Sequence, residues 1–425
     1  MARRDRIKNT LRIILLILFI IPVFATNYAH TKQLFVVIIT VDGDDTATEG
    51  TNSLLDVTDF FNNTSLEDIF PDYTDTSSVI GQLDFRGIGT ILEFESNSSE
   101  LVFRIPGRDF EVRFDGESRD ESVKQFKQWL RGTFESIEAP GRSLTRLLQI
   151  VVANSPVDPV AGNPNSLFTR MIIDDFNQGI TGPFISSRNP IPGQKNNFSI
   201  SAAVTSFNAD PYDGETFSIP ISYKWNLKSV PKLSLIVDFP VLLTRTQTAW
   251  SYMASLGLGA QYRPTKWWSL TPMARVGGVG SFDVGALAFP LSGTLTNYFH
   301  YQFPTTHVGW ASQGGAITTI DGIEIAGWDL SYELTNYVWR NGGDLLQKMD
   351  FNIFGNRAAF KLFLNHTKFW GSELYLESFF DMGIGLATIK KLDYTFVEKM
   401  NLTFTLSSGV DNDYQNYGIK ATYRF

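Results

Sequence analysis

Apolar and polar residues alternate with a period of two from about Asn197 to the end of the chain. In the clearest stretch, 250–262, apolar residues such as Trp250, Leu256 and Leu258 alternate with small or polar ones. Successive side chains of a strand point to opposite faces, so this pattern predicts strands with one apolar and one polar face. The clearest stretches hold about 9 to 13 residues, longer than the usual strand of about five or six in soluble sheets.

The alternating stretches predict twelve strands, an even number. Three of them are open to another interpretation, because Pro304, Gly314-Gly315 and Gly355-Asn356 could mark turns or bulges, and ten or fourteen strands would also fit. The predicted strands are 198–207, 216–227, 232–243, 250–262, 268–282, 286–303, 306–316, 328–339, 350–364, 374–386, 398–408 and 416–425.

Strand length favours a barrel in lipid over a soluble sandwich. A sandwich turns its apolar faces inward, whereas a transmembrane barrel turns them outward and needs about 9 to 11 residues per tilted strand. Aromatic residues also gather near the predicted strand ends, as expected for girdles at the two water–lipid interfaces. These are Tyr223, Trp225, Trp250, Tyr262, Trp267, Trp268, Tyr337 and Trp339. The fold class is therefore mainly β, a C-terminal transmembrane antiparallel β-barrel of about twelve strands preceded by a small α+β soluble module.

Residues 26–160 show the mixed periodicity of that α+β module. Residues 33–40 predict a strand, 50–76 an acidic surface segment, and three short stretches at 91–94, 101–105 and 110–114 predict a β-meander. Apolar positions three and four apart predict helices over 123–137, 143–151 and 165–176. Residues 161–196 then form a helix and a Gly- and Pro-rich linker, and the barrel occupies 197–425.

Residues 1–25 have the layout of a secretory signal peptide. A basic stretch precedes the apolar block Ile13–Val23, and the small residue Ala25 follows. We expect cleavage after Ala25, although an uncleaved anchor would look similar. An apolar block of about 11 residues falls short of the ~20 that a membrane-spanning helix needs. Export to the cell outer membrane of a Gram-negative bacterium is the expected localisation.

Composition narrows the possible chemistry. The 36 Lys and Arg against 44 Asp and Glu leave a net charge of -8, which disfavours nucleic acid as a partner. The absence of cysteine excludes disulfides, iron–sulfur clusters and thiol nucleophiles. The acidic turn 42–45 with Glu49 lacks the spacing of an EF-hand, so it predicts a solvated turn. We expect neither a metal nor a cofactor.

The last predicted strand carries the most specific signal. An amphipathic strand that ends in an aromatic residue resembles the assembly signal read by the outer-membrane barrel insertion machinery. The expected partners are therefore outer-membrane lipid, that machinery and periplasmic chaperones. The residues of the predicted membrane-assembly signal are Tyr417, Ile419, Ala421, Tyr423 and Phe425.

Charged residues on the polar faces are predicted to face the lumen. They could pair and plug it, or bias the ions that pass through it. Twelve strands enclose a narrow bore, which favours a plugged lumen, with the helix 165–176 as the plug candidate or else as a periplasmic helix. The predicted lumen-facing residues are Lys224, Asp238, Arg275, Glu333, Glu373, Glu377, Asp381, Lys420 and Arg424.

A helical segment from Asn163 to Phe176, a Gly/Pro-rich connector and a barrel ending in Tyr423-Arg424-Phe425 together resemble the translocator domain of an autotransporter. The similarity is to the solitary barrels of that family that lack a long passenger, and it covers residues 163–425. It implies a structural or secretion-related role. The front half departs from the family, because a compact α+β module replaces the repetitive β-helical passenger and no repeat of 20 to 50 residues is visible.

Two other functions fit the sequence. One is a small outer-membrane, porin-like channel. The other is a barrel hydrolase in which His300, His307 or His366 pairs with a residue such as Ser312 or Asp329 near the rim. Spacing along the chain does not show whether such a pair forms, and solvated histidines in loops are the more common case, so we expect no enzyme activity.

Overall fold

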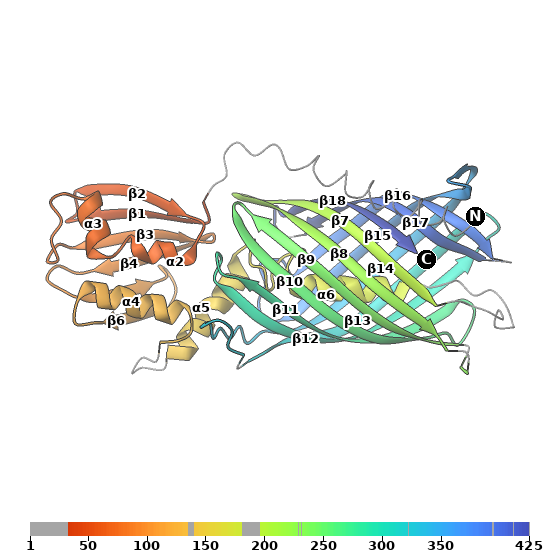
Figure 1. Cartoon of the computed structure of the whole chain (residues 1–425), viewed down its shortest axis with the longest axis horizontal. Helices are drawn as coiled ribbons and strands as arrows, with labels where there is room; N and C mark the ends of the chain where they lie inside the picture. Colours follow the sequence, from red (N-terminus) through yellow and green to blue (C-terminus); the bar gives the residue numbers. More distant parts are fainter. Residues whose placement is uncertain are drawn as a thin grey trace, which may run out of the picture.

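The computed structural model consists of a six-stranded sheet with its helices and a closed β-barrel that lies beside it (Figure 1). It describes residues 33–134, 140–180, 196–227, 229–230, 232–321, 323–392, 395–410 and 412–424. The predicted signal peptide and Phe425 lie outside the described residues.

The N-terminal sheet is antiparallel throughout, with the strand order β2-β1-β3-β4-β5-β6. The apolar face of its strands points into the protein, as in a soluble sheet. In β1, Phe35, Val37 and Ile39 are buried, whereas Ile38 on the opposite face is 41% exposed. The strands are β1 (Phe35–Val41), β2 (Asp45–Thr51), β3 (Val79–Phe85), β4 (Ile88–Phe94), β5 (Glu100–Arg104) and β6 (Glu111–Asp115).

Helices pack on the apolar face of this sheet. The predicted surface segment 50–76 contains two short helices that bury Leu54, Val57 and Leu66. The longer α4 begins after Ser118, whose hydroxyl accepts a hydrogen bond from the backbone of Glu121. The helices of the N-terminal domain are α2 (Leu54–Asp59), α3 (Asn63–Ile69) and α4 (Arg119–Leu130). Two further helices follow in the chain, α5 (Pro140–Asn154) and α6 (Leu167–Ile180). We call residues 33–134 with their sheet and α2–α4 the N-terminal domain.

Twelve antiparallel strands close the barrel, which confirms the predicted fold class and strand number. The three strands that the sequence left open are all present. The strands are β7 (Asn197–Ala209), β8 (Tyr212–Asn226), β9 (Leu233–Thr246), β10 (Ala249–Tyr262), β11 (Trp268–Ser281), β12 (Ala286–Gln302), β13 (Thr306–Ile320), β14 (Thr335–Ile353), β15 (Asn356–Gly371), β16 (Ser378–Leu392), β17 (Thr395–Gly409) and β18 (Gln415–Arg424).

Three predicted strands began several residues too early. Strand β14 starts at Thr335 and not at residue 328, β15 starts at Asn356 and not at 350, and β16 starts at Ser378 and not at 374. Leu374 and Leu376 precede β16 and are 5% and 3% exposed, because they join the apolar core at one mouth of the barrel. Alternation that continues through a connector does not reveal where strand pairing begins.

The apolar face of the barrel strands points away from the lumen. In β10 the outward residues Trp250, Tyr252 and Leu258 are 36%, 58% and 55% exposed, whereas the inward Ser251 and Ser255 are buried. An outer apolar surface of this kind suits contact with acyl chains. Separately, none of the helices in the described part of the chain is long and apolar enough to cross a bilayer.

The six connectors at one mouth of the barrel face the N-terminal domain, and we call this end the domain mouth. The backbone of Leu54 donates to Asp283 at 2.8 Å, and the hydroxyl of Tyr212 donates to Asp84 at 3.1 Å. One apolar core runs from the N-terminal domain into the domain mouth without a break. The opposite end, where β18 ends at Arg424, we call the far mouth.

The segment 155–169, which follows α5 and includes the first three residues of α6, is buried throughout at the domain mouth. Asp158 in this segment pairs with Arg86 of the β3–β4 turn at 3.2 Å, and both side chains are fully buried. The Asp158 carboxylate also accepts hydrogen bonds from the backbone of Val160 and Ala161. This segment therefore closes the domain mouth and fixes the N-terminal domain to it.

Candidate functional site

Helix α6 lies inside the barrel (Figure 1) and packs against one half of the wall, strands β10 to β13. Its buried residues recur three and four positions apart, which places them on one helix face. The sequence predicted this segment to be either a plug or a periplasmic helix, and the structure places it in the lumen. The buried residues are Leu167, Phe168, Thr169, Met171, Ile172, Asp175, Phe176 and Gly179.

A fully buried ion cluster holds α6 to the wall. Arg275 of β11 donates from Nε to Asp175 of α6 at 2.8 Å and from Nη2 to Asp238 of β9 at 2.6 Å. Its third nitrogen, Nη1, donates to the hydroxyl of Ser255 at 3.0 Å, and Thr294 donates to the second oxygen of Asp175 at 3.0 Å. Every charge in the cluster has a partner, which is the condition under which buried charges are tolerated.

Further contacts fix the C-terminal end of α6. Gln178 donates to Asp238 at 2.9 Å, and Gln261 of β10 donates to the carbonyl oxygen of Gly179 at 2.9 Å. Gly179 allows a close approach, because a Cβ atom there would lie 2.6 Å from Thr296 of β12. Since Gln261 lies near the far mouth, α6 runs from the domain mouth towards the far mouth.

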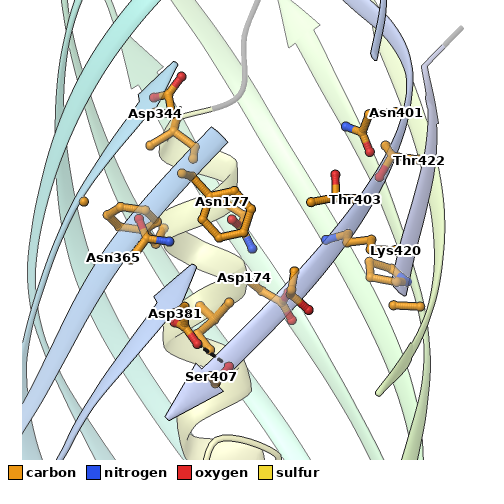
Figure 2. Close-up of a pocket in the computed structure, with 18 of the residues that line it drawn as sticks. Asp174, Asn177, Asp344, Asn365, Asp381, Asn401, Thr403, Ser407, Lys420 and Thr422 are labelled. Carbon is orange, nitrogen blue, oxygen red and sulfur yellow. Dashed lines mark hydrogen bonds between the residues drawn. The ribbon is translucent and has the colours of Figure 1, made fainter. Parts of the chain in front are cut away.

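The opposite half of the lumen is not filled by α6. A cavity of about 210 Å³ lies between the helix and strands β13–β18 and β7–β9, and we call it the vestibule. Figure 2 shows Asp174 and Asn177 of α6 facing polar side chains of the wall across it. Arg340 of β14 pairs with Asp381 of β16 at 2.7 Å, and Ser407 donates to the same carboxyl group at 2.6 Å.

Six of the predicted lumen-facing residues lie on the inner side of the wall. Lys224, Asp238, Asp381, Lys420 and Arg424 line the vestibule or a smaller cavity beside it, and Arg275 belongs to the buried cluster.

The other three predicted lumen-facing residues do not face the lumen. Glu333 and Glu373 are exposed in the β13–β14 and β15–β16 connectors, and Glu377 pairs with Lys368 at 2.8 Å just before β16. The prediction was wrong for them because it extended the alternation beyond the ends of the strands. Sequence reasoning also missed Arg340 and Lys361, although the first would have followed from a longer β14.

His307, near the far mouth, forms a hydrogen bond with the phenol hydroxyl of Tyr298. The Tyr298 hydroxyl lies 2.9 Å from His307 Nε2 and donates to Asp344 Oδ1 at 2.9 Å, with His300 stacked on the Tyr298 ring. Asp329, a predicted neighbour, lies at the domain mouth, where its backbone bonds to that of Arg131. The structure therefore does not bring His307 and Asp329 together.

His366 forms a hydrogen bond with Ser378 at 2.9 Å. Its strand neighbour Asn365 faces the lumen, as does Asp381, which lies opposite Asn365 in β16. His366 therefore belongs to the outer face of the barrel, where it contacts the ring of Phe380. No carboxylate is bonded to His366 among the residues that the structure describes. The pair therefore lacks the third group that orients a catalytic imidazole.

The acidic turn of the N-terminal domain has a structural explanation. Asp42 accepts hydrogen bonds from the backbone and the hydroxyl of Ser78 at 2.8 and 3.2 Å. The hydroxyl of Ser77 and the backbone of Ser78 hold the pKa of Asp42 below its usual value. Within the described residues, no group of three or more His, Asp or Glu side chains has the arrangement of a metal site.

The predicted assembly signal forms part of β18, which pairs with β17 and β7 and so closes the barrel. Tyr417 is 53% exposed. Tyr423 lies opposite Met400 and Ile200 in the two ladders. Recognition of this strand by the insertion machinery stays a prediction.

No protein-family model matches the chain, and no curated protein matches it significantly. Among solved structures, it is similar to the translocator domain of the autotransporter NalP from Neisseria meningitidis, at 11% identity and a TM-score of 0.40, over 61% of this chain and 95% of that one. It is also similar to the β domain of the Bordetella autotransporter BrkA, at 12% identity and a TM-score of 0.38, over 54% and 98% of the two chains.

The KdgM porin is a third similar structure, with 9–10% identity in two structures and, for the free porin, a TM-score of 0.32 over 53% of this chain and 99% of that one. The matched share of this chain corresponds in size to the barrel. At these identities and TM-scores, the similarities assign neither a family nor an activity.

Proposed function

We propose that this chain is an outer-membrane anchor, related in layout to autotransporter translocators, that holds its N-terminal domain on the outside of the cell. The observation that carries the proposal is the path of α6. The helix enters the lumen at the domain mouth, runs towards the far mouth, and is followed by β7, whose first residue, Asn197, lies at the far mouth. A chain with this path has its N-terminal domain on one side of the membrane and the start of its barrel on the other.

The connectors favour the domain mouth as the extracellular end. Outer-membrane barrels have short periplasmic turns and longer extracellular loops. The longest connector, between Ile320 and Thr335, belongs to the domain mouth, whereas the longest at the far mouth spans only the gap between Asn226 and Leu233. In this orientation the N-terminal domain caps the barrel from outside.

The N-terminal domain bound at the domain mouth and helix α6 bonded to the barrel wall favour an anchoring role over a channel. The buried segment 155–169 fills the domain mouth, and α6 is bonded to the wall by the fully buried Arg275 cluster. We propose no catalytic role, since the His307 and His366 environments lack the arrangement that activates a serine.

Cysteine labelling tests the proposed orientation, because the chain has no cysteine of its own. Thr48 of β2 and Asn352 near the β14–β15 turn are both exposed and lie at opposite ends of the molecule. With a membrane-impermeant maleimide on intact cells, we expect Thr48→Cys to be labelled and Asn352→Cys to be labelled only after the outer membrane is permeabilised.

The reverse pattern would place the N-terminal domain in the periplasm and overturn the proposed function. Equal labelling of both cysteines on intact cells would mean that the barrel does not separate them, which would also contradict it. The unmodified cysteine-free chain is the matched control for background labelling.

A further inference from the structure

The vestibule has no role in the proposed function, because a helix that only spans the lumen does not require a polar cavity beside it. Its lining includes Asp174 and Asn177 from α6 and reaches from Pro164, just before the helix, to Ile180 at the end of the helix. It therefore extends along the length of α6 on the side away from the Arg275 cluster.

We propose that the vestibule is a binding site for a small multivalent anion of the phosphate or sulfate class, which enters from the far mouth. The inference is independent of which side of the membrane the far mouth faces, and so it goes beyond the proposed function.

Burial along the vestibule shows where a ligand could enter. Near the domain mouth its lining is closed: Thr205, Ser407 and Asn416 are 7%, 7% and 5% exposed. Towards the far mouth, Lys361 and Arg424 are only half-buried. Since a closed barrel wall surrounds the cavity, a lipid with its acyl chains has no lateral entry, and the ligand has to be a small solute.

The charge of the lining selects an anion. The cationic side chains Arg170, Arg340, Lys361, Lys420 and Arg424 outnumber the carboxylates Asp174, Asp344 and Asp381 by two, in a chain whose net charge is -8. Two of the three carboxylates are already engaged within the protein. Asp381 pairs with Arg340 at 2.7 Å, and Asp344 accepts a hydrogen bond from Tyr298 at 2.9 Å.

Strands β17 and β18 supply the rest of a site. In Figure 2, Lys420 and Thr422 of β18 lie beside Thr403 and Asn401 of β17 on the wall that faces α6. The hydroxyl and amide groups can donate hydrogen bonds, and Lys420 can supply a charge-assisted one, which is the combination that binds oxyanions.

The size of the cavity limits the ligand. Its volume of about 210 Å³ is below the roughly 300–1,000 Å³ of pockets that hold drug-sized ligands. Inorganic phosphate or sulfate fits this space, whereas a long oligosaccharide or a folded polypeptide does not.

Equilibrium dialysis of the full-length protein in a neutral detergent against radiolabelled inorganic phosphate, at about 0.15 M ionic strength, tests the inference. We expect saturable binding of one phosphate per chain. Lys420→Gln should weaken it by about tenfold or more, because a hydrogen bond to a charged group is lost. Lys232→Gln is the matched control, since Lys232 is exposed between β8 and β9, outside the vestibule, and donates to the carbonyl oxygen of Pro264.

Absence of saturable binding by the unmodified chain would overturn the inference, and so would an equal loss in Lys420→Gln and Lys232→Gln. Asn401→Asp is a second variant, which adds a negative charge to the site and should abolish binding while the heat-dependent mobility of the folded barrel on a gel is retained. Because the measurement uses purified protein, its failure leaves the labelling test of orientation unaffected.

Discussion

The N-terminal sheet and the barrel use the same alternation of apolar and polar residues in opposite senses. In β1 the apolar Phe35, Val37 and Ile39 face a packed core, whereas in β10 the apolar Tyr252 and Leu258 face outward. The two regions differ in strand length, which is five to seven residues in the sheet and ten to nineteen in the barrel. Alternation alone shows only that a strand has two different faces. Strand length, together with closure of the sheet into a barrel, shows whether the apolar face packs against a protein core or faces lipid.

The inner faces differ as well. The N-terminal domain fills its core with aromatic and aliphatic side chains, whereas the barrel is occupied by a helix held through buried charges. A polar lumen can hold a helix firmly only if each buried charge is paired, and Arg275 meets that requirement by joining Asp175 to Asp238.

Breaking the ion cluster should have the largest effect on the barrel. Arg275→Met leaves Asp175 and Asp238 without their shared cation, and removal of one partner from a buried pair costs about 3–5 kcal/mol. We expect urea unfolding of the barrel in detergent to shift by that amount. The triple variant Arg275→Met, Asp175→Asn and Asp238→Asn should recover much of the loss. A single variant as stable as the unmodified protein would show that the cluster does not hold α6.

A core truncation should act on the N-terminal domain and leave the barrel folded. Phe103 is fully buried against Phe126 and Trp129, with ring centroids 5.4 and 5.7 Å away. Phe103→Ala should cost about 3–5 kcal/mol, so residues 33–134 should become sensitive to protease while the gel mobility of the barrel is unchanged. Ile38→Ala on the open face of the sheet is the control, and equal sensitivity of the two variants would argue against this core.

A charge on the outer face should distinguish lipid from water around the barrel. Leu258 lies between the aromatic ends of β10, and Leu258→Arg should cost about 2–4 kcal/mol for folding into lipid vesicles. Tyr262→Arg at the end of the strand should cost only about 0–1 kcal/mol. If both changes had the small effect usual for water-exposed positions, the outer face would not be in lipid.

The junction between the two regions should be less sensitive. Tyr212→Phe removes the hydrogen bond from the barrel to Asp84 at 3.1 Å, which stabilises the contact by about 0.5–1.5 kcal/mol. We expect slightly faster proteolysis of the N-terminal domain and no change in the barrel. A complete release of the domain would mean that the junction depends on far fewer contacts than the continuous core suggests.

The smallest effect concerns acid stability of the N-terminal domain. Because the folded-state pKa of Asp42 is lowered, its ionised form stabilises the domain above the unfolded pKa of about 3.9, and this contribution is lost as the pH falls through the folded value. Asp42→Asn should therefore be less stable than the unmodified domain at neutral pH, and the difference should vanish in acid. A difference that persists in acid would contradict this assignment.

Much of the fold could be predicted from the sequence, because each barrel strand carries its own amphipathic pattern. The ends of the strands were harder to predict where polar residues continued a strand. Arg340-Asn341-Gly342-Gly343 looks like a turn, yet these residues lie within β14 and pair with β13 and β15. Helices α2 and α3 were missed because they have only six and seven residues, too few to show a 3.6-residue period.

The site was predictable only in part. Alternation indicated that Lys420 and Asp381 would face the lumen, because each belongs to a regular strand. The joining of Asp175 to Arg275, one hundred positions away in the chain, depends on where α6 docks, and spacing does not specify that. Likewise, a connector such as the one that holds Glu333 can continue an alternating pattern without belonging to the wall.

Spin labelling of β17 in lipid bilayers tests the outward apolar face most directly. Leu402 and Phe404 are exposed on the outside, whereas Thr403 and Thr405 line the vestibule. With one cysteine-linked label at a time, we predict high oxygen accessibility at 402 and 404 and high accessibility to a water-soluble nickel reagent at 403 and 405. If the nickel reagent reached 402 and 404 as readily as 403 and 405, the barrel would not span a bilayer in this way.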